Sequence, residues 1–576
     1  MSLVQNLKTS SQPLDHLGLV AATIDNLGLV DEIDRLLPLE AKAKTTMGQR
    51  VAAMILNGLG FVDDRLYLFP KFLSNKPVSR LLGEGLQAAD FNDDTLGRCL
   101  DKIHQFGINN LFGQLAFKIG IKNKLLGKSM HTDTTSLTLY GDYEEEELEV
   151  TEAPKDTSTG TIISAISDKG KDLEEETLVN PLEGRPIPKR GHAKNKRFDL
   201  KQMVLTLATT GKAGFPIWME SHSGNSSDAK TLQETAQRIQ AFCKTLENAP
   251  SFLYVGDAAM YNNCVKYGNN LQWLSRVPEQ VKLAKEILKD NTLSWNTIDE
   301  HYKCHATVKT HNNVEQRWLV VFSQYAYDKE AATLMKNVEK EYNAMSKALW
   351  HLGNQEFSCA KDAAKALKKF SQQLKYHSSI AQVQPLAKHG KTGRPVKDSK
   401  PDLLFYKIEG KLTQDEEAIT NTKMTKGKFI LATNQLDTKL LSDHEMLSEY
   451  KEQSSTESGF KFIKDNSFEV SSIFVKKPER ISALMMVMTL CLMVYSFAQY
   501  TLRNTLIANE ETIPSQTNKM TNKPTMKWIY RLFYGVAVVK LQLEERVQEI
   551  VTNIDELLTR IIRYFGSKAM LIYDVV

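Results

Sequence analysis

The order of strands and helices predicted between residues 129 and 280 is the feature that most constrains the fold of this chain. "SMHTDTTSLTLY" (129–140) is rich in β-branched residues and alternates in polarity, which predicts a strand. "KQMVLTLATT-GKAG-FPIWMES" (201–221) predicts two strands joined by a glycine-containing hairpin turn. "SDAKTLQETAQRIQAFCKTL" (227–246) predicts an amphipathic helix, and "SFLYVGD" (251–257) predicts the next strand. The order is therefore three antiparallel strands, a helix and a fourth strand.

Two aspartates lie on the first and fourth of these strands. This is the strand order of a ribonuclease-H-like sheet, in which the fourth strand lies beside the first and parallel to it, so Asp133 and Asp257 are expected to face each other. Two adjacent carboxylates repel, and one takes up a proton unless a cation lies between them. Oxygen ligands favour Mg²⁺ or Mn²⁺. The alternative is that Asp257 only caps the helix that follows it.

A third acid lies in "YKEQSSTESGFKFIKD" (450–465). Tyr450, Gln453, Glu457 and Lys464 follow one another at intervals of 3, 4 and 7, which at ~100° per residue predicts one helical stripe roughly 60° wide. A solvated helix face is the alternative interpretation. Small residues between them favour close approach of a ligand or another backbone, which makes Glu457 a candidate third oxygen ligand. These small residues are Ser454, Ser455, Ser458 and Gly459.

These motifs resemble the DDE transposases of bacterial insertion sequences. Asp133 in "HTDTTS", Asp257 in "VGDAAMY" and the Y-x2-R-x3-E-x6-K spacing from Tyr450 to Lys464 are similar to the branch with the Y-R-E-K signature. "DLKQMVLTLATTGKAGFPIWMESHSGNSSDAKTL" and "LQWLSRVP" resemble the same branch. One residue departs from the signature, because Gln453 stands where the family has arginine. Glutamine can donate a hydrogen bond to phosphate but carries no charge.

The resemblance implies an α/β catalytic core with a ribonuclease-H-like, mixed five-stranded sheet. An α+β insertion domain interrupts this core, and helical regions flank it at both ends. The expected boundaries are a helical N-terminal domain with a role in DNA-end binding (1–125), the first part of the core (129–280, with a polar insert at about 141–198), the insertion domain (281–428), the second part of the core with the catalytic helix (429–475) and a helical C-terminal region (476–576).

The resemblance also implies an activity. Two Mg²⁺ ions, or Mn²⁺ as a substitute, would lie ~3.5–4 Å apart on Asp133, Asp257 and Glu457. The enzyme would cleave DNA at the terminal inverted repeats of a transposon and transfer the strand into target DNA, working as a homodimer on paired ends. Two alternatives stay open: a catalytically inactive DNA-binding regulator derived from such an element, and a metal-dependent nuclease that does not join DNA.

Several polar residues are predicted to contact DNA phosphates. In the family, the signature residues aligned with Tyr450, Gln453 and Lys464 contact the transposon end, and Arg276 is a further candidate. The basic segment "KRGHAKNKR" (189–197) is expected to make salt-sensitive phosphate contacts, although a solvated loop is the alternative. Its cationic residues are Lys189, Arg190, Lys194, Lys196 and Arg197. Candidates for a base-holding tryptophan are Trp295, Trp318 and Trp350, for each of which core packing is the alternative.

Cysteine spacing and the termini bear on the compartment. The six cysteines lie far apart without a CxxC pair, which is typical of reduced thiols in a cytoplasm. "KCHATVKTH" (303–311) has no second ligand pair at zinc-site spacing. The N-terminal segment has no apolar signal core. We expect a cytoplasmic protein that associates with the nucleoid when it is bound to DNA.

One segment is long and apolar enough to cross a membrane. "ISALMMVMTLCLMVYSFAQY" (481–500) has the length of a spanning helix. Polar residues interrupt it, among them Ser482, Thr489 and Gln499, and it directly follows the predicted catalytic helix. We therefore predict a buried helix and no membrane partner.

Overall fold

The structure is a computed structural model, and it describes most of the chain. The described residues are 7–38, 43–60, 69–140, 186–191, 197–246, 251–264, 271–388, 403–465, 477–543 and 546–576. The chain divides into two compact units: unit 1 comprises Met1–Gly256 and Lys451–Val576, and unit 2 comprises Asp257–Tyr450.

Helices predominate in the first part of unit 1. Local sequence explains several of their ends: the Thr46 hydroxyl accepts from the Gln49 amide in a capping box, and Gly28 ends the first helix with a positive φ of 68°. These elements are α1 (Leu17–Leu27), α2 (Leu29–Leu36), α3 (Met47–Gly58), α4 (Phe69–Ser74), α5 (Val78–Leu82), the 3-10 helix η2 (Ala88–Phe91), α6 (Asp93–Phe106) and α7 (Ile108–Lys122).

A mixed sheet with the strand order β4-β3-β2-β5 forms the centre of unit 1. Its strands are β2 (Ser129–Thr138), β3 (Gln202–Thr210), β4 (Phe215–Ser223) and β5 (Leu253–Gly256), with α8 (Asp228–Lys244) between β4 and β5. β3 pairs antiparallel with both β2 and β4, whereas β5 pairs parallel with β2. The predicted order of strands, and the parallel placement of the fourth strand beside the first, are confirmed.

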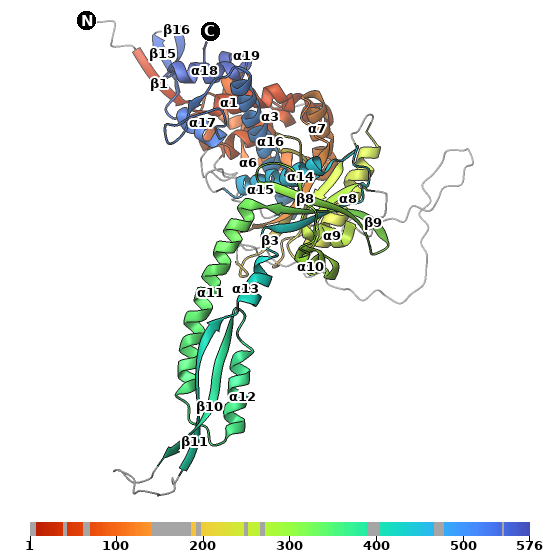
Figure 1. Ribbon diagram of the computed structural model, residues 1–576. Helices are drawn as coiled ribbons and strands as arrows, with labels where there is room; N and C mark the ends of the chain where they lie inside the picture. The colour runs from red at the N-terminus through yellow and green to blue at the C-terminus, as the bar shows by residue number, and fades with distance from the viewer. Residues whose placement is uncertain are drawn as a thin grey trace, which may run out of the picture. The chain divides into compact units, whose positions relative to one another are not determined.

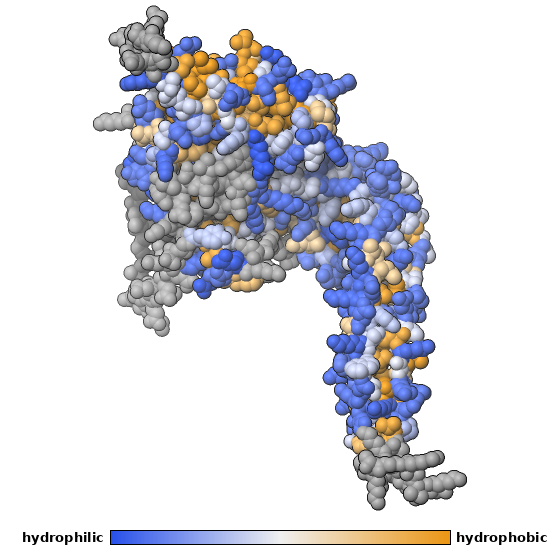
Figure 2. Space-filling model, turned by 90° about the vertical axis from the view of Figure 1, so that its left-hand side faces the viewer, coloured by the Kyte–Doolittle hydropathy of each residue, from blue (hydrophilic) through white to orange (hydrophobic). Residues whose placement is uncertain are grey.

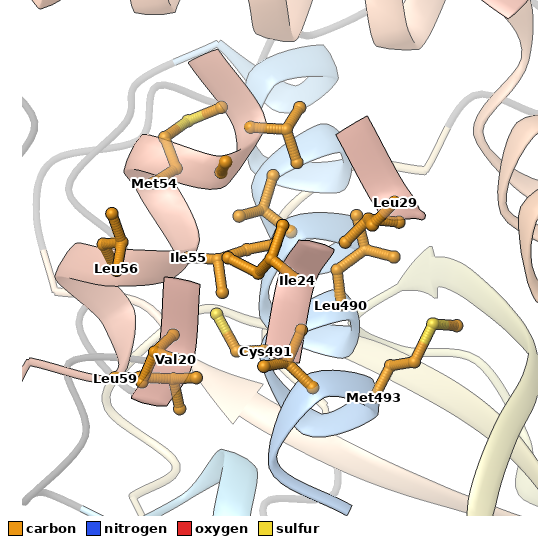
Figure 3. Close-up of a cluster of buried hydrophobic side chains, with 14 of the residues drawn as sticks. Val20, Ile24, Leu29, Met54, Ile55, Leu56, Leu59, Leu490, Cys491 and Met493 are labelled. Carbon is orange, nitrogen blue, oxygen red and sulfur yellow. The ribbon is translucent and has the colours of Figure 1, made fainter. Parts of the chain in front are cut away.

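A long apolar helix, α16 (Pro478–Ala508), crosses the core of unit 1. It packs against α1, α3, α6 and β4, and Figure 3 shows its side chains interleaved with those of the N-terminal helices. By length and hydropathy α16 could span a membrane, but 83% of its most apolar window is buried inside the structure. The prediction of a buried helix is confirmed. Residues labelled in Figure 3 are Val20, Ile24, Leu29, Met54, Ile55, Leu56, Leu59, Leu490, Cys491 and Met493.

The two ends of the chain meet in a second sheet of unit 1, with the order β1-β15-β16. The prediction of a helical C-terminal region is therefore wrong in part, because the alternating "AVVKLQL" and "RVQEIVT" form two strands that pair antiparallel. The elements after α16 are β13 (Ile513–Pro514), β14 (Met520–Thr521), α17 (Met526–Leu532), β15 (Ala537–Leu543), β16 (Arg546–Thr552), α18 (Glu556–Tyr564) and α19 (Ser567–Ile572), and β1 is Leu7–Pro13.

Unit 2 contains a run of antiparallel strands in the order β6-β12-β9-β8-β7. Trp273 and Trp318 are fully buried in its core. The strands are β6 (Trp273–Arg276), β7 (Asn296–Thr297), β8 (Tyr302–His311), β9 (Val314–Ser323) and β12 (Lys428–Thr433), and the helices beside them are α9 (Ala258–Cys264) and α10 (Lys282–Lys289). Helix α14 (Asp443–Lys451) passes into unit 1 at its last residue.

Residues 324–423 of unit 2, here called the arm, extend from the end of β9 (Figure 1). Ser323 caps the first arm helix by accepting from the Ala326 amide. The arm comprises α11 (Gln324–Gly353), α12 (Ala360–Ser371), the antiparallel pair β10 (His377–Lys388) and β11 (Leu403–Gln414), and α13 (Glu416–Lys423). Figure 2 shows that its visible face is mainly hydrophilic, with a narrower band of hydrophobic residues.

Candidate active site

Asp133 lies in the middle of β2, and the residues on either side of it in the strand are buried. It pairs with Leu207 of β3, and His131 pairs with Thr209, so all four side chains point to one face. Asp133 is half-buried, and its Oδ1 accepts from the Thr134 amide at 2.7 Å. The sequence therefore places a carboxylate on a rigid strand, among buried neighbours.

His131 lies two residues before Asp133 on the same face. Burial lowers the pKa of His131 to about 4, so this imidazole is neutral at neutral pH and adds no positive charge beside the aspartate. Its Nε2 lies 2.9 Å from the Ser129 Oγ, and its buried Nδ1 has no hydrogen-bond partner among the described residues. His131 thus adds polarity but no positive charge to this face of the sheet.

Helix α15 (Ser454–Ile463) lies against this face of the sheet. The Thr456 Oγ1 is 2.6 Å from the Thr209 Oγ1 and 3.3 Å from the His131 carbonyl oxygen. At Gly459 an added Cβ would lie 3.2 Å from the Leu207 Cδ2, so the absence of a side chain lets the helix approach the strand. The expectation that small residues permit a close approach here is confirmed at Gly459, whereas Ser454 and Ser458 are exposed.

Glu457 lies between the two contact residues of α15. It is ~100° around the helix from Thr456, which places it on the flank of the helix rather than on its buried face. Its side chain is exposed, and no described residue donates a hydrogen bond or an ion pair to its carboxylate. Glu457 and Asp133 thus both come from elements that meet at the β2–β3 face. Carboxylate oxygens are ligands that suit Mg²⁺ and Mn²⁺, so this donor set fits the expected metal.

The predicted helical stripe from Tyr450 to Lys464 is wrong as a single helix. α14 ends at Lys451, Gln453 is the N-cap residue of α15, and Lys464 is its C-cap residue. The break precedes three consecutive hydroxyl residues, 454–456, whose side chains compete for backbone hydrogen bonds and favour a helix start over a helix interior. The 3-4-7 spacing therefore does not place the four side chains on one face.

Asp257 begins unit 2, directly after the last residue of β5. Its Oδ1 accepts from the Ala259 amide at 2.9 Å, and its carbonyl oxygen accepts from the Ser275 hydroxyl at 2.6 Å. The capping alternative raised by the sequence is therefore present in the structure. Asp257 is exposed, and the part of the chain that the structure describes provides no further hydrogen bond to its carboxylate.

Two of the predicted DNA contacts lie together within unit 2. The Arg276 guanidinium lies 5.5 Å from the centroid of the Phe429 ring and pairs with Glu279 at 3.1 Å. The Tyr450 ring lies 6.2 Å from that of Phe429. The Phe429 ring thus lies beside both the Arg276 guanidinium and the Tyr450 ring. The sequence analysis missed Phe429 because "GKFILATNQ" predicts only a strand.

The structure describes three of the five cationic residues of the basic segment 189–197. Lys189 and Arg190 are exposed, and the Lys189 backbone pairs with Gln202 at the start of β3. Arg197 forms a bidentate pair with Asp199, at 2.8 and 2.7 Å, which offsets its charge. Lys194 and Lys196 lie outside the described residues.

The three tryptophan candidates differ in burial. Trp318 is fully buried, and its Nε1 donates to the Gln316 Oε1 at 2.9 Å, so it is a core residue. Trp295 is half-buried beside Phe322. Trp350 is 65% exposed on the arm helix α11.

Sequence reasoning also missed the residues that join α15 to the sheet. His131 follows the period of two that places it on the face of Asp133, so strand alternation could have found it. The pairing of Thr209 with Thr456 spans 247 positions in the sequence. A contact between residues so far apart cannot be predicted from a local sequence pattern.

Two models of known protein families match parts of the chain. A family model described as "Transposase DDE domain" matches residues 177–494, more than half of the chain. A second model, "Domain of unknown function (DUF4277)", matches residues 9–117. The chain belongs to the transposase DDE domain family. Membership implies a transposase, an enzyme that cleaves and joins DNA.

Among solved structures, the chain is similar to that described as "Cryo-EM structure of piggyBac transposase synaptic complex with hairpin DNA". The identity is 10%, the TM-score is 0.34, and the match covers 91% of this chain and 82% of that chain. No curated protein is significantly similar to the chain in sequence.

Proposed function

We propose that this transposase cleaves the ends of a bacterial insertion sequence and transfers them into target DNA, with Asp133, Asp257 and Glu457 as its metal-holding carboxylates. Within the family we assign it to the Y-R-E-K branch, with Gln453 in place of the arginine. Divalent ions bound there, Mg²⁺ or Mn²⁺, supply the charge that stabilises the attacking and leaving oxygens of a phosphodiester.

The register of β2 and β5 carries this proposal. The last parallel pair is His131 with Val255. Asp133 comes two residues after His131 on β2, and Asp257 comes two residues after Val255, directly after the end of β5. Equal spacing from the last pair supports a shared cation between the two acids. Glu457 is supported as the third ligand because α15 packs on the same face as Asp133.

Residues of this chain would position the metal ions and contact the DNA phosphates. Asp133 is fixed by its strand, and neutral His131 adds no positive charge beside it. Tyr450, Arg276, Gln453 and Lys464 would contact phosphates near the cut, and the segment 189–197 would add salt-sensitive contacts.

The proposal extends to domains and assembly. A ribonuclease-H-like core (129–280 and 429–475) would be interrupted by an insertion domain (281–428). The protein would act as a homodimer on paired ends, in the cytoplasm and on the nucleoid.

The experiment that tests this function is the substitution Glu457→Gln in the full-length protein. The change keeps the size of the side chain and removes its charge, so the protein should still fold and bind transposon-end DNA. Cleavage with Mg²⁺ should fall by several orders of magnitude, because the charge that holds the metal is lost. Cleavage and joining are measured on DNA that carries the inverted repeats flanking the gene.

A matched control is Glu286→Gln on α10, which makes the same charge change on an exposed helical residue outside the site. It should cleave like the wild type. Near-normal cleavage by Glu457→Gln would show that α15 does not supply the third ligand. Cleavage by the wild type without any joined product would favour the nuclease alternative.

A further inference from the structure

Four lysines of α12 occupy one face of this arm helix. Lys361, Lys365, Lys368 and Lys369 stand at i, i+4, i+7 and i+8, which at ~100° per residue confines them to a sector roughly 100° wide. All four are exposed. At ~1.5 Å per residue the row is about 12 Å long. These four residues are called the lysine face.

The lysine face points away from the rest of the arm. The opposite side of α12 carries Ala363 and Phe370, which are buried where the helix packs on β10 and β11 (Figure 1). No described residue forms an ion pair with any of the four lysines. The one acid of α12, Asp362, lies at its first turn, where its Oδ2 accepts from the Cys359 thiol at 3.1 Å. The lysines therefore neither cover a core nor neutralise an acid.

The neighbouring helix α11 shows what an ordinary solvated face looks like. It contains four lysines and four acids, so its charges cancel. α12 contains four lysines against one acid, a net charge of +3 (4 − 1) on 12 residues. Solubility is served by interspersed charges of both signs, as on α11, and does not require a row of one sign. A single-sign row is instead typical of a surface that binds a polyanion.

We propose that the lysine face binds the phosphate backbone of double-stranded target DNA. This inference rests on the transposase function proposed above. Duplex DNA carries one negative charge per ~1.7 Å, or about seven over the ~12 Å length of the row. Lysine meets phosphate as a point charge, and α12 contains no arginine or asparagine for paired contacts with a base edge. The contact is therefore independent of sequence, which suits a target duplex rather than a terminal repeat that must be recognised by its sequence.

The test compares two fourfold variants of the full-length protein. The first changes Lys361, Lys365, Lys368 and Lys369 to glutamine, and the control changes the exposed α11 lysines Lys329, Lys336, Lys340 and Lys347 to glutamine. Both lose four positive charges, and glutamine matches lysine in helix propensity. Binding to a random-sequence duplex is measured over a range of salt concentrations. The slope of log K against log[salt] should fall by about two to four for α12, at ~0.9 per lost phosphate contact, and by less than about one for α11.

Joining to the target should fall with the α12 substitutions, while cleavage at the transposon ends stays at the wild-type level. Equal losses in both variants would overturn the proposal, because total charge would then be the cause. An unchanged slope in the α12 variant would overturn it as well. So would binding of poly-glutamate that the α12 substitutions abolish while duplex binding stays unchanged, which would indicate an acidic protein as the partner.

Two further readouts keep the test independent of folding and of catalysis. Circular dichroism checks that both variants fold, and the double variant Lys365→Gln/Lys368→Gln should show about half the change in slope. Duplex binding requires no cleavage. A wild-type protein that cuts and joins no DNA, yet loses its salt slope in the α12 variant, would refute the transposase function and leave the phosphate contact established.

Discussion

Helices α16 and α11 are almost equal in length, 31 and 30 residues, and have opposite surroundings. Sixteen residues of α16 are buried, whereas only three of α11 are: Leu334, Val338 and Leu349. α16 packs on all sides against helices and strands of unit 1. α11 packs along one stripe in the arm and presents charged residues of both signs to solvent.

The difference teaches that the number of packed faces, not the length of a helix, fixes its composition. A helix enclosed on every side must be apolar all round, and α16 meets this condition so fully that it satisfies the criteria for a membrane span. A helix that packs on one side needs only a stripe. Identical changes in the two helices should therefore have very different effects.

The largest expected loss of stability comes from shortening one buried side chain of the enclosed helix α16. Leu490 of α16 is fully buried, so Leu490→Ala should lower the free energy of unfolding by about 2–5 kcal/mol through lost apolar contact and a cavity. Met335 of α11 is 52% exposed, and Met335→Ala should change it by less than about 0.5 kcal/mol. Urea unfolding followed by circular dichroism measures both. Similar losses would mean that α11 is enclosed in solution, for example by another chain.

The same contrast separates two arginine–carboxylate pairs of unit 1. Glu220 is 1% exposed and accepts two hydrogen bonds from Arg238, at 2.9 and 2.6 Å. Burial alone would raise the pKa of Glu220, but the hydrogen bonds from Arg238 and Thr235 outweigh it, so this pKa lies below its ordinary value of 4.5. Asp199 is exposed, and its hydrogen bonds with Arg197 lower its pKa to about 2. Since water screens the exposed pair, the lowered pKa of Asp199 carries little stability.

Glu220→Gln should cost about 1–3 kcal/mol at pH 7, because buried donors lose their charged acceptor. A carboxyl whose folded pKa is depressed stabilises the fold above its unfolded pKa and loses that effect as the pH falls through the folded pKa. The gap between wild type and variant should therefore be full above about pH 4.5 and close below it. Asp199→Asn, the exposed control, should show no measurable difference. A gap for Glu220→Gln that persists to the lowest pH at which both proteins fold would point to lost packing instead of lost charge.

The parts of the fold that local pattern determines were predictable. The alternation of residues 129–140 and the run 251–257 located β2 and β5 and hence Asp133 and Asp257. The polar residues that interrupt the apolar run 481–500 predicted that α16 is a buried helix and not a membrane span. Contacts between distant segments were not predictable in this way. The pairing of β1 with β15 joins the two ends of the chain, and the Thr209–Thr456 contact fixes α15 against the sheet.

The helix break before Gln453 shows a further limit of spacing. The intervals from Tyr450 to Lys464 satisfy helical periodicity, but periodicity assumes an uninterrupted helix. Two of the hydroxyl residues after the break make a tertiary contact: the Ser455 and Thr456 oxygens both lie within hydrogen-bonding distance of the Thr209 oxygen on β3. A tertiary contact thus outweighs the local pattern at the point where the candidate site is built.

The smallest expected loss of stability concerns the contact between α15 and the sheet. Two buried threonines test it, one that makes this contact and one that does not. Thr456 and Thr489 are both fully buried. The Thr456 hydroxyl joins α15 to β3 and β2, whereas the Thr489 hydroxyl donates to the Met485 carbonyl of its own helix, α16, at 2.9 Å. Met485 belongs to the preceding helical turn, so its carbonyl oxygen keeps its backbone hydrogen bond when the hydroxyl is lost.

Thr456→Val should therefore lower the free energy of unfolding by about 1 kcal/mol, the net contribution of a buried hydrogen bond, and Thr489→Val by less than half as much. If Glu457 is a metal ligand, Thr456→Val should also reduce DNA cleavage by about tenfold or more, because the adjacent Glu457 is then held less accurately. Thr489→Val should leave cleavage unchanged. Parallel measurements of unfolding and cleavage separate the two effects: equal losses of stability in both variants would show that the contact between α15 and the sheet contributes no more than a bond within one helix.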